Sequence, residues 1–165
     1  MLVREITPAD AGEFVKLTQQ VENTSEYMLW EAGERKASPD QQRKMIEKIG
    51  TNENSTILVA EEENKLIGFL MAIGGNARRN KHSVYLVIGI LQNFRGKRIG
   101  TKLFEELEKW ATTHQIHRLE LTVVTQNAAG LSLYKKKGFE IEGTKRHSLL
   151  IDGEFVDEYY MSRLL

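Results

Sequence analysis

The sequence of 165 residues contains no cysteine and only two prolines, and 23 lysines and arginines balance 23 aspartates and glutamates. Without cysteine there is no disulfide, no cysteine-ligated metal site and no thiol nucleophile. The balanced charge gives no general reason to expect a nucleic acid or an anionic membrane as partner. No apolar run approaches the roughly 20 residues that cross a bilayer. The first residues also lack the layout of a signal peptide. We therefore expect a cytoplasmic protein with neither kind of partner.

The length fits one domain, which we expect to span residues 1–165. Hydrophobic residues alternate with polar ones in some segments and follow helical spacing in others, in the order β-α-α-β-β-β-α-β-α-β-β. No linker, repeat or low-complexity segment interrupts this series. The order predicts an α/β (α+β) fold with a mixed central sheet of about seven strands, flanked by about four helices.

Local signals give the boundaries of these elements. Ser38, Pro39 and Gln41 combine an N-cap, a first-turn proline and a capping-box partner, so a helix is expected to begin there. Residues 22–37 show no clear pattern, and residues 92–100 open a long helix. The strands are expected at about 2–7, 56–61, 66–73, 83–91, 118–124, 139–149 and 155–161, and the helices at about 8–21, 39–49, 92–114 and 128–137.

A basic, glycine-bearing loop precedes the longest helix. At a helix N-terminus the first N–H groups lack intrahelical partners, and the positive end of the helix dipole lies there. Glycines let the backbone approach an anion, so the loop suits a phosphate or pyrophosphate. The alternative is a solvated basic helix start. The loop lacks both the G-x-G-x-x-G dinucleotide fingerprint and the P-loop pattern. Its cations are Arg95, Lys97, Arg98 and Lys102.

A second segment follows the strand at 118–124. Asn127 is placed as the N-cap of a short helix, and Gly138 as the residue that ends it. Tyr134 lies inside this helix. Taken alone, Tyr134 also fits the role of a half-buried packing residue.

Together the two segments resemble the GNAT superfamily of acetyl-CoA-dependent N-acetyltransferases. Residues 95–100 are similar to its Q/R-x-x-G-x-G/A motif, and residues 127–139 to its N-x-x-A-x-x-L-Y-x-x-x-G-F segment. Residues 139–144, 152–157 and 159–161 resemble the C-terminal part of a subgroup that includes phosphinothricin-type, amino-acid and ribosomal-protein-type acetyltransferases. Two positions depart from the motifs, since Arg98 replaces a usual glycine and Gly130 a usual alanine.

The resemblance implies the GNAT fold and acetyl-CoA as co-substrate. A gap would open between the strands at 83–91 and 118–124, and Gly89 is the residue there that most easily accommodates a bulge. Tyr134 would protonate the leaving sulfur as the catalytic acid. The cofactor-binding residues would be Ile88 and Ile90 along the pantetheine arm, Asn127 bonded to that arm, and Arg95, Gly96, Lys97, Arg98, Ile99 and Gly100 at the pyrophosphate.

The resemblance favours a small-molecule amine, an amino acid or related compound, as acceptor. A protein N-terminus, as in the ribosomal type, and a non-catalytic CoA-binding sensor are the alternatives. The irregular segment at 22–37 stands where the family builds its acceptor pocket. We expect no metal, because the four histidines lack ligand spacing, and the family suggests a homodimer. The general base stays open among Glu26, Glu31, Tyr85 and Glu120, each of which also fits a surface or structural role.

Overall fold

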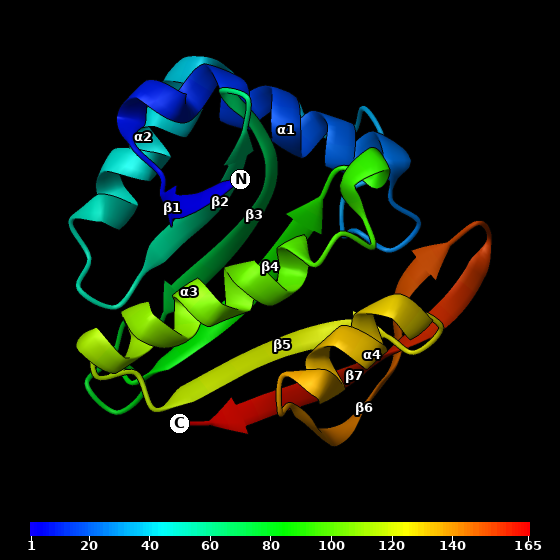
Figure 1. Cartoon of the computed structure of the whole chain (residues 1–165). Helices are drawn as coiled ribbons and strands as arrows, with labels where there is room; N and C mark the ends of the chain where they lie inside the picture. Colours follow the sequence, from blue (N-terminus) through cyan, green and yellow to red (C-terminus); the bar gives the residue numbers. More distant parts are fainter.

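A single seven-stranded sheet forms the frame of the computed structural model, which describes residues 1–165 (Figure 1). The strand order is β1-β2-β3-β4-β5-β7-β6, and only the β4–β5 pair is parallel. The mixed sheet, the four helices and the order of the elements confirm the predicted fold. The strands are β1 (Leu2–Glu5), β2 (Thr56–Glu62), β3 (Lys65–Gly74), β4 (Ser83–Ile90), β5 (Arg118–Val124), β6 (Glu140–Ile151) and β7 (Glu154–Leu164), and the helices are α1 (Ala11–Thr24), α2 (Pro39–Gly50), α3 (Ile99–Thr113) and α4 (Ala128–Lys136).

The ends of the elements follow local hydrogen bonding. The capping box predicted for α2 is present, because the Gln41 N–H donates to Ser38 Oγ at 3.2 Å and the Ser38 N–H donates to Gln41 Oε1 at 3.1 Å. Two short 3₁₀ turns precede α1 and α3, at Pro8–Asp10 and Gln92–Phe94. Strand β7 runs further than predicted, to Leu164, because its residues from Glu158 to Leu164 pair with the whole of β5.

The helices cover opposite faces of the sheet. Phe69 of β3 packs edge-on against Phe14 of α1, with ring centroids 5.5 Å apart. Its neighbour Gly68 points the other way, where an added Cβ would lie 3.4 Å from Ile99 of α3. Helices α1 and α2 therefore lie on one face, and α3 and α4 on the other (Figure 1). None of the helices combines the length and the hydrophobicity that crossing a membrane requires.

Strands β4 and β5 separate after a short stretch of pairing. Their register covers only residues 83–85 of β4 against 118–120 of β5. Beyond Tyr85 and Glu120 each strand is held by its other neighbour, β4 by β3 and β5 by β7. The gap predicted between the two strands is therefore present.

The bulge expected at Gly89 is absent. The β3–β4 ladder runs from Gly68 opposite Ile90 to Gly74 opposite Val84 without a shift of register. Glycine is needed at position 89 for packing, since a Cβ would lie 2.6 Å from Phe69 Cε1 and 2.9 Å from Val21 Cγ1. The prediction of a bulge was wrong. A strand also needs glycine where a helix packs closely against it, and the sequence alone does not distinguish this need from a bulge.

The packing at Gly89 gives a stability prediction. Gly89→Ala should lower the free energy of unfolding by about 1–3 kcal/mol, because its methyl group overpacks the contact between α1 and β3. Gly143→Ala is the matched control, since nothing lies within 4 Å of its Cβ position. Urea unfolding of both variants measures the difference. Equal stabilities for the two variants would contradict the packing role of Gly89.

Candidate active site

The separation leaves the backbone of β4 exposed toward β5. The Leu91 N–H donates to Ile67 O at 3.0 Å and the Gly75 N–H to Ser83 O at 3.1 Å, so odd-numbered residues of this strand bond to β3. On the other side, the Arg118 N–H of β5 donates to His82 O at 3.1 Å. Because these directions alternate along a strand, Ile88 and Ile90 direct their N–H and C=O groups into the gap.

The loop after β4 brings cations to the first turn of α3. All four cations are exposed, and none of them is paired with a carboxylate. The Arg95 Nε–H reaches Ile90 O at 3.4 Å, and Lys97 Nζ lies 5.1 Å from the centroid of the Phe94 ring. No side chain caps the N-terminus of α3. The first N–H groups of the helix are therefore available to an anion, and unpaired positive charges surround them.

The backbone conformation of Arg98 explains why glycine is usual at this position. The residue is the N-cap of α3 and has φ 64° and ψ 18°, in the left-handed region. Gly96 also has a positive φ, of 74°. A non-glycine residue pays roughly 1–2 kcal/mol for this conformation. The local backbone needed for the helix start is thus kept with arginine in place of glycine.

Ile99 and Gly100 have packing roles as well as backbone groups at the helix start. The Ile99 side chain is buried in the core. A Cβ at Gly100 would lie 2.8 Å from Leu133 Cδ2 of α4, so the glycine lets α3 and α4 approach closely. Only the backbone of these two residues is therefore free to contact a ligand.

Asn127 caps α4 as predicted, and Gly130 makes room for it. The Gly130 N–H donates to Asn127 Oδ1 at 3.0 Å. A Cβ at Gly130 would lie only 2.7 Å from Asn127 Nδ2. The Asn127 amide nitrogen donates to no group of the protein and is free to bind a ligand.

Tyr134 of α4 is both a packing residue and a protonated phenol. Its ring lies 6.0 Å from that of Phe104 and 6.1 Å from that of Phe139, and it is only 8% exposed. Burial raises the pKa of Tyr134 to about 12, and the charge of Tyr85 adds to the shift. Its hydroxyl group therefore keeps its proton at neutral pH and has no hydrogen-bond partner within the protein.

Two of the four candidate bases lie at the neck of the gap. Tyr85 and Glu120 face each other in the last β4–β5 pair. The Tyr85 hydroxyl is 2.7 Å from Thr122 Oγ1, and Glu120 Oε2 accepts a hydrogen bond of 2.8 Å from Arg118 Nε. Glu120 is thus a carboxylate held in place beside the gap.

The other two candidates, Glu26 and Glu31, are exposed on the segment between α1 and α2. This segment starts near the mouth of the gap, because α1 ends beside Gly89 (Figure 1). It is fixed by an ion pair between Arg35 and the buried Glu22, and the Arg35 guanidinium lies 5.4 Å from the Trp30 ring centroid. The sequence analysis missed the ion pair between Arg35 and Glu22. The two residues are 13 positions apart, and no local pattern in the sequence connects them.

Comparison with known proteins agrees with this geometry. The family model described as Acetyltransferase (GNAT) family matches residues 21–139. This range contains both the basic loop and the segment with Tyr134. The L-amino acid N-acetyltransferase AaaT of Escherichia coli (strain K12) is 33% identical over 111 residues, which are 65% of this chain and 67% of that protein.

Solved structures give the same result over the whole chain. A GNAT-family acetyltransferase from Streptococcus pneumoniae superposes with a TM-score of 0.96 at 30% identity, covering 99% of both chains. A ribosomal-protein-alanine N-acetyltransferase from Brucella melitensis has a TM-score of 0.86 at 26% identity, covering 100% of both chains. By its fold and by the family match, this chain belongs to the GNAT family and is an N-acetyltransferase.

Proposed function

We propose that the protein transfers the acetyl group of acetyl-CoA directly to the primary amine of a small molecule, an amino acid or a related compound. One observation carries this proposal. The backbone of Ile88 and Ile90 has no partner strand on the side of the gap, and it belongs to the strand that leads into an uncapped, basic helix N-terminus. The buried phenol of Tyr134 lies on α4, which packs against that helix start at Gly100. An extended ligand with an anionic end and a reactive end fits such a site.

The residues present fit acetyl-CoA. The first N–H groups of α3, at Ile99 and Gly100, would bind the pyrophosphate together with Arg95, Gly96, Lys97 and Arg98. The pantetheine arm would pair with the backbone of Ile88 and Ile90, as an added strand does, and accept a bond from Asn127. A Salmonella typhimurium protein with this fold (TM-score 0.86, 20% identity, covering 99% of this chain and 93% of that one) holds acetyl-CoA.

Bound acetyl-CoA supplies a thioester whose carbonyl carbon accepts the amine. The Ile90 N–H would stabilise the negative charge that develops on the carbonyl oxygen, an interaction typically worth about 2.7–4 kcal/mol. As the nitrogen–carbon bond forms and the carbon–sulfur bond breaks, Tyr134 would give its proton to the sulfur. The chain without cysteine suits direct transfer, because no covalent enzyme intermediate is needed.

The amine must lose a proton before or during the attack, and Glu120 is the favoured acceptor of that proton. Its register position places it at the neck of the gap, and Arg118 orients it. Tyr85 lies opposite and is hydrogen-bonded to Thr122. Glu26 and Glu31 are exposed, and no lysine or arginine is paired with either carboxylate to orient it, which makes them weaker candidates.

The acceptor class rests on similarity. The relative AaaT is named an L-amino acid N-acetyltransferase, whereas the Brucella melitensis structure is a ribosomal-protein-alanine N-acetyltransferase. A protein N-terminus is therefore the second candidate acceptor. The single domain, the cytoplasmic location, the homodimer and the lack of a metal, nucleic-acid or membrane partner stay predictions.

Release of free CoA thiol tests the proposal. In each assay the protein is incubated with acetyl-CoA and one class of acceptor. The classes are L-amino acids, polyamines, aminoglycosides and short peptides with a free N-terminus. We expect turnover with at least one small amine. Turnover with peptides alone would favour the ribosomal type, and tight CoA binding without turnover on any amine would favour a sensor.

The role of Tyr134 gives a second prediction. Tyr134→Phe should lower kcat by about 100-fold or more, because the proton donor for the sulfur is lost. The affinity for CoA and the thermal stability should change little, since the ring still packs and the hydroxyl has no partner to lose. Steady-state kinetics and calorimetry measure the two effects. An unchanged kcat would remove Tyr134 from the role of acid.

The basic loop gives a third prediction. Arg95→Gln and Arg98→Gln should each weaken CoA binding by about tenfold, because each removes a charge-assisted contact to phosphate. The difference in CoA affinity between the wild type and each variant should become smaller as the salt concentration rises, because salt screens the contacts that the wild-type arginines make. Arg78→Gln is the control, since Arg78 is an exposed arginine in the loop before β4, at the opposite end of that strand. Equal weakening by all three variants would indicate nonspecific charge attraction instead of a phosphate site.

A further inference from the structure

Glu158 of β7 is a buried carboxylate without a partner in the protein. The residue is only 9% exposed, and no lysine, arginine or histidine forms an ion pair with it. No donor of the protein bonds to its carboxylate. Among fully buried polar side-chain atoms only Ser148 Oγ lacks a hydrogen-bond partner, so the Glu158 oxygens still reach solvent. Because burying an unpaired charge is costly, this carboxylate favours a cation from outside.

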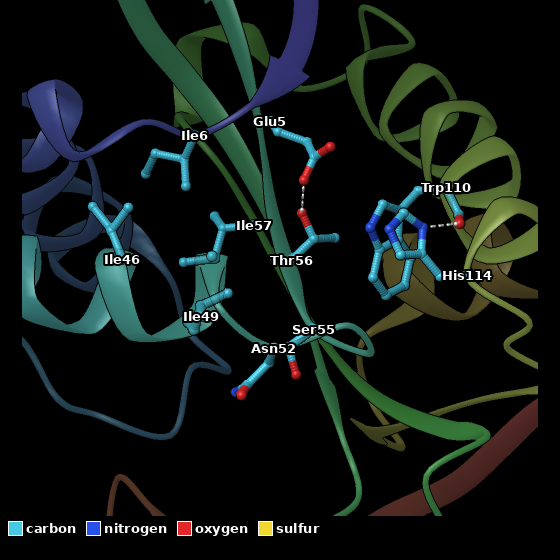
Figure 2. Close-up of a pocket in the computed structure, with 11 residues that line it drawn as sticks. Glu5, Ile6, Ile46, Ile49, Asn52, Ser55, Thr56, Ile57, Trp110 and His114 are labelled. Carbon is cyan, nitrogen blue, oxygen red and sulfur yellow. Dashed lines mark hydrogen bonds between the residues drawn. The ribbon is translucent and has the colours of Figure 1, made fainter.

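Glu5 shows the contrast, although it lines a pocket of about 100 Å³ (Figure 2). Glu5 is exposed, and it accepts a hydrogen bond of 2.7 Å from the Thr56 hydroxyl. The buried Ile57 follows Thr56 in β2 and therefore points to the other face of the sheet (Figure 2). The carboxylate of Glu5 is thus already bonded and open to water, whereas that of Glu158 has no partner and little exposure.

The register of the sheet places Glu158 level with the site of the thioester. The last residues that pair across the gap are Tyr85 of β4 and Glu120 of β5. Four residues further along each strand, Gly89 is level with Val124, and Val124 lies opposite Glu158 in the β5–β7 ladder. Gly89 stands between the two isoleucines of β4 whose backbone faces the gap. Glu158 is therefore at their level, one strand beyond β5.

Glu158 lies on the face of the sheet from which an acceptor can reach the gap. The Tyr85 hydroxyl is 2.7 Å from Thr122 Oγ1, so these side chains share one face, and Gly89 points from this face toward α1. Because side chains alternate along a strand, Val124 follows Thr122 on this face, and Glu158 opposite it shares the face. Helices α3 and α4 cover the other face. Tyr85 is 40% exposed, so the face of Glu158 is open to solvent beside the gap.

Two cations of β5 and β6 share this face, and neither of them neutralises Glu158. Arg118 is paired with Glu120 and Glu142 at the neck of the gap. Lys145 lies opposite Glu158 on β6, but it is exposed and forms no ion pair with that carboxylate. The negative charge of Glu158 is therefore available to a ligand.

The position of Glu158 also indicates which part of an acceptor it would meet. Neighbouring strands lie about 4.8 Å apart, and β5 lies between Glu158 and the gap. A nitrogen that attacks a thioester inside the gap is therefore separated from Glu158 by the width of one strand. A positively charged group at the other end of a short carbon chain spans that width.

We propose that Glu158 binds a second positively charged group of the acceptor, so that the enzyme selects dibasic amines, such as short diamines and basic amino acids. This selection rests on the proposed function, because it takes the thioester to lie in the gap. The reacting amine would lie in the gap, and the second ammonium group would form a charge-assisted hydrogen bond with the Glu158 carboxylate. Glu158 is thus a specificity residue and takes no part in proton transfer.

Two acceptors of equal chain length test this role. 1,4-Diaminobutane and n-butylamine offer the same reacting amine, and only the diamine carries a second charge. At saturating acetyl-CoA and constant ionic strength, kcat/KM per amino group should be about tenfold or more higher for the diamine. Glu158→Gln should remove this preference by raising KM for the diamine, and it should leave the kinetics with n-butylamine unchanged.

A control variant and a binding measurement complete the test. Glu140→Gln removes an equal charge from an exposed position on β6, opposite Ser162 at the level of the neck, and should keep the preference. Calorimetry with the CoA-saturated protein measures binding of 1,4-diaminobutane without turnover. Glu158→Gln should weaken this binding by about tenfold or more.

The outcomes separate this role of Glu158 from the proposed function. Glu158-dependent binding of the diamine without turnover of either amine would support the role and contradict the proposed function. Turnover with equal kcat/KM for the two amines, or a preference that survives in Glu158→Gln, would overturn the role and leave the proposed function intact. An equal loss of preference in Glu140→Gln, or neither turnover nor Glu158-dependent binding, would overturn the role as well.

Discussion

The separation of β4 from β5 is the constraint on which the rest of the site depends. The two strands pair over only three residues each, up to Tyr85 and Glu120. Unpaired backbone inside a sheet is costly unless it finds a partner. The sheet tolerates the gap because β3 holds β4 and β7 holds β5 along their lengths. The result is a fixed row of donors and acceptors at Ile88 and Ile90.

Close packing around this gap brings the other chemical groups to its rim. Gly89 lets α1 approach β4, so the segment with Arg35 and Trp30 begins at the mouth of the gap. Gly100 lets α4 approach α3, which brings Tyr134 near the helix start that carries the basic loop. Two glycines thus connect the hydrophobic core to the arrangement of the reactive groups. In both places the missing side chain decides how near a helix can come.

Much of this arrangement could be predicted from the sequence, because local signals carried it. The structure confirmed the features that contiguous sequence patterns predicted. These are the capping residues Ser38 and Asn127, the basic loop and the order of the elements. The left-handed conformation of Arg98 has no signal in the residue itself, because glycine marks such positions and arginine stands here in its place. The ion pair between Glu22 and Arg35 and the contacts of Gly89 with Phe69 and Val21 join residues from different parts of the chain. Such tertiary contacts leave no periodic signal in one sequence, and the glycine at 89 was misread for the same reason.

Amide hydrogen exchange tests the central claim most directly. The amides of Ile88 and Ile90 point into the gap and should exchange faster than those of Val87 and Gly89, which bond to β3. Saturating CoA should slow exchange at Ile88 and Ile90 strongly and leave the reference amides nearly unchanged. Exchange rates at Ile88 and Ile90 that stay the same with CoA bound would contradict the account, because the ligand would then lie outside the gap.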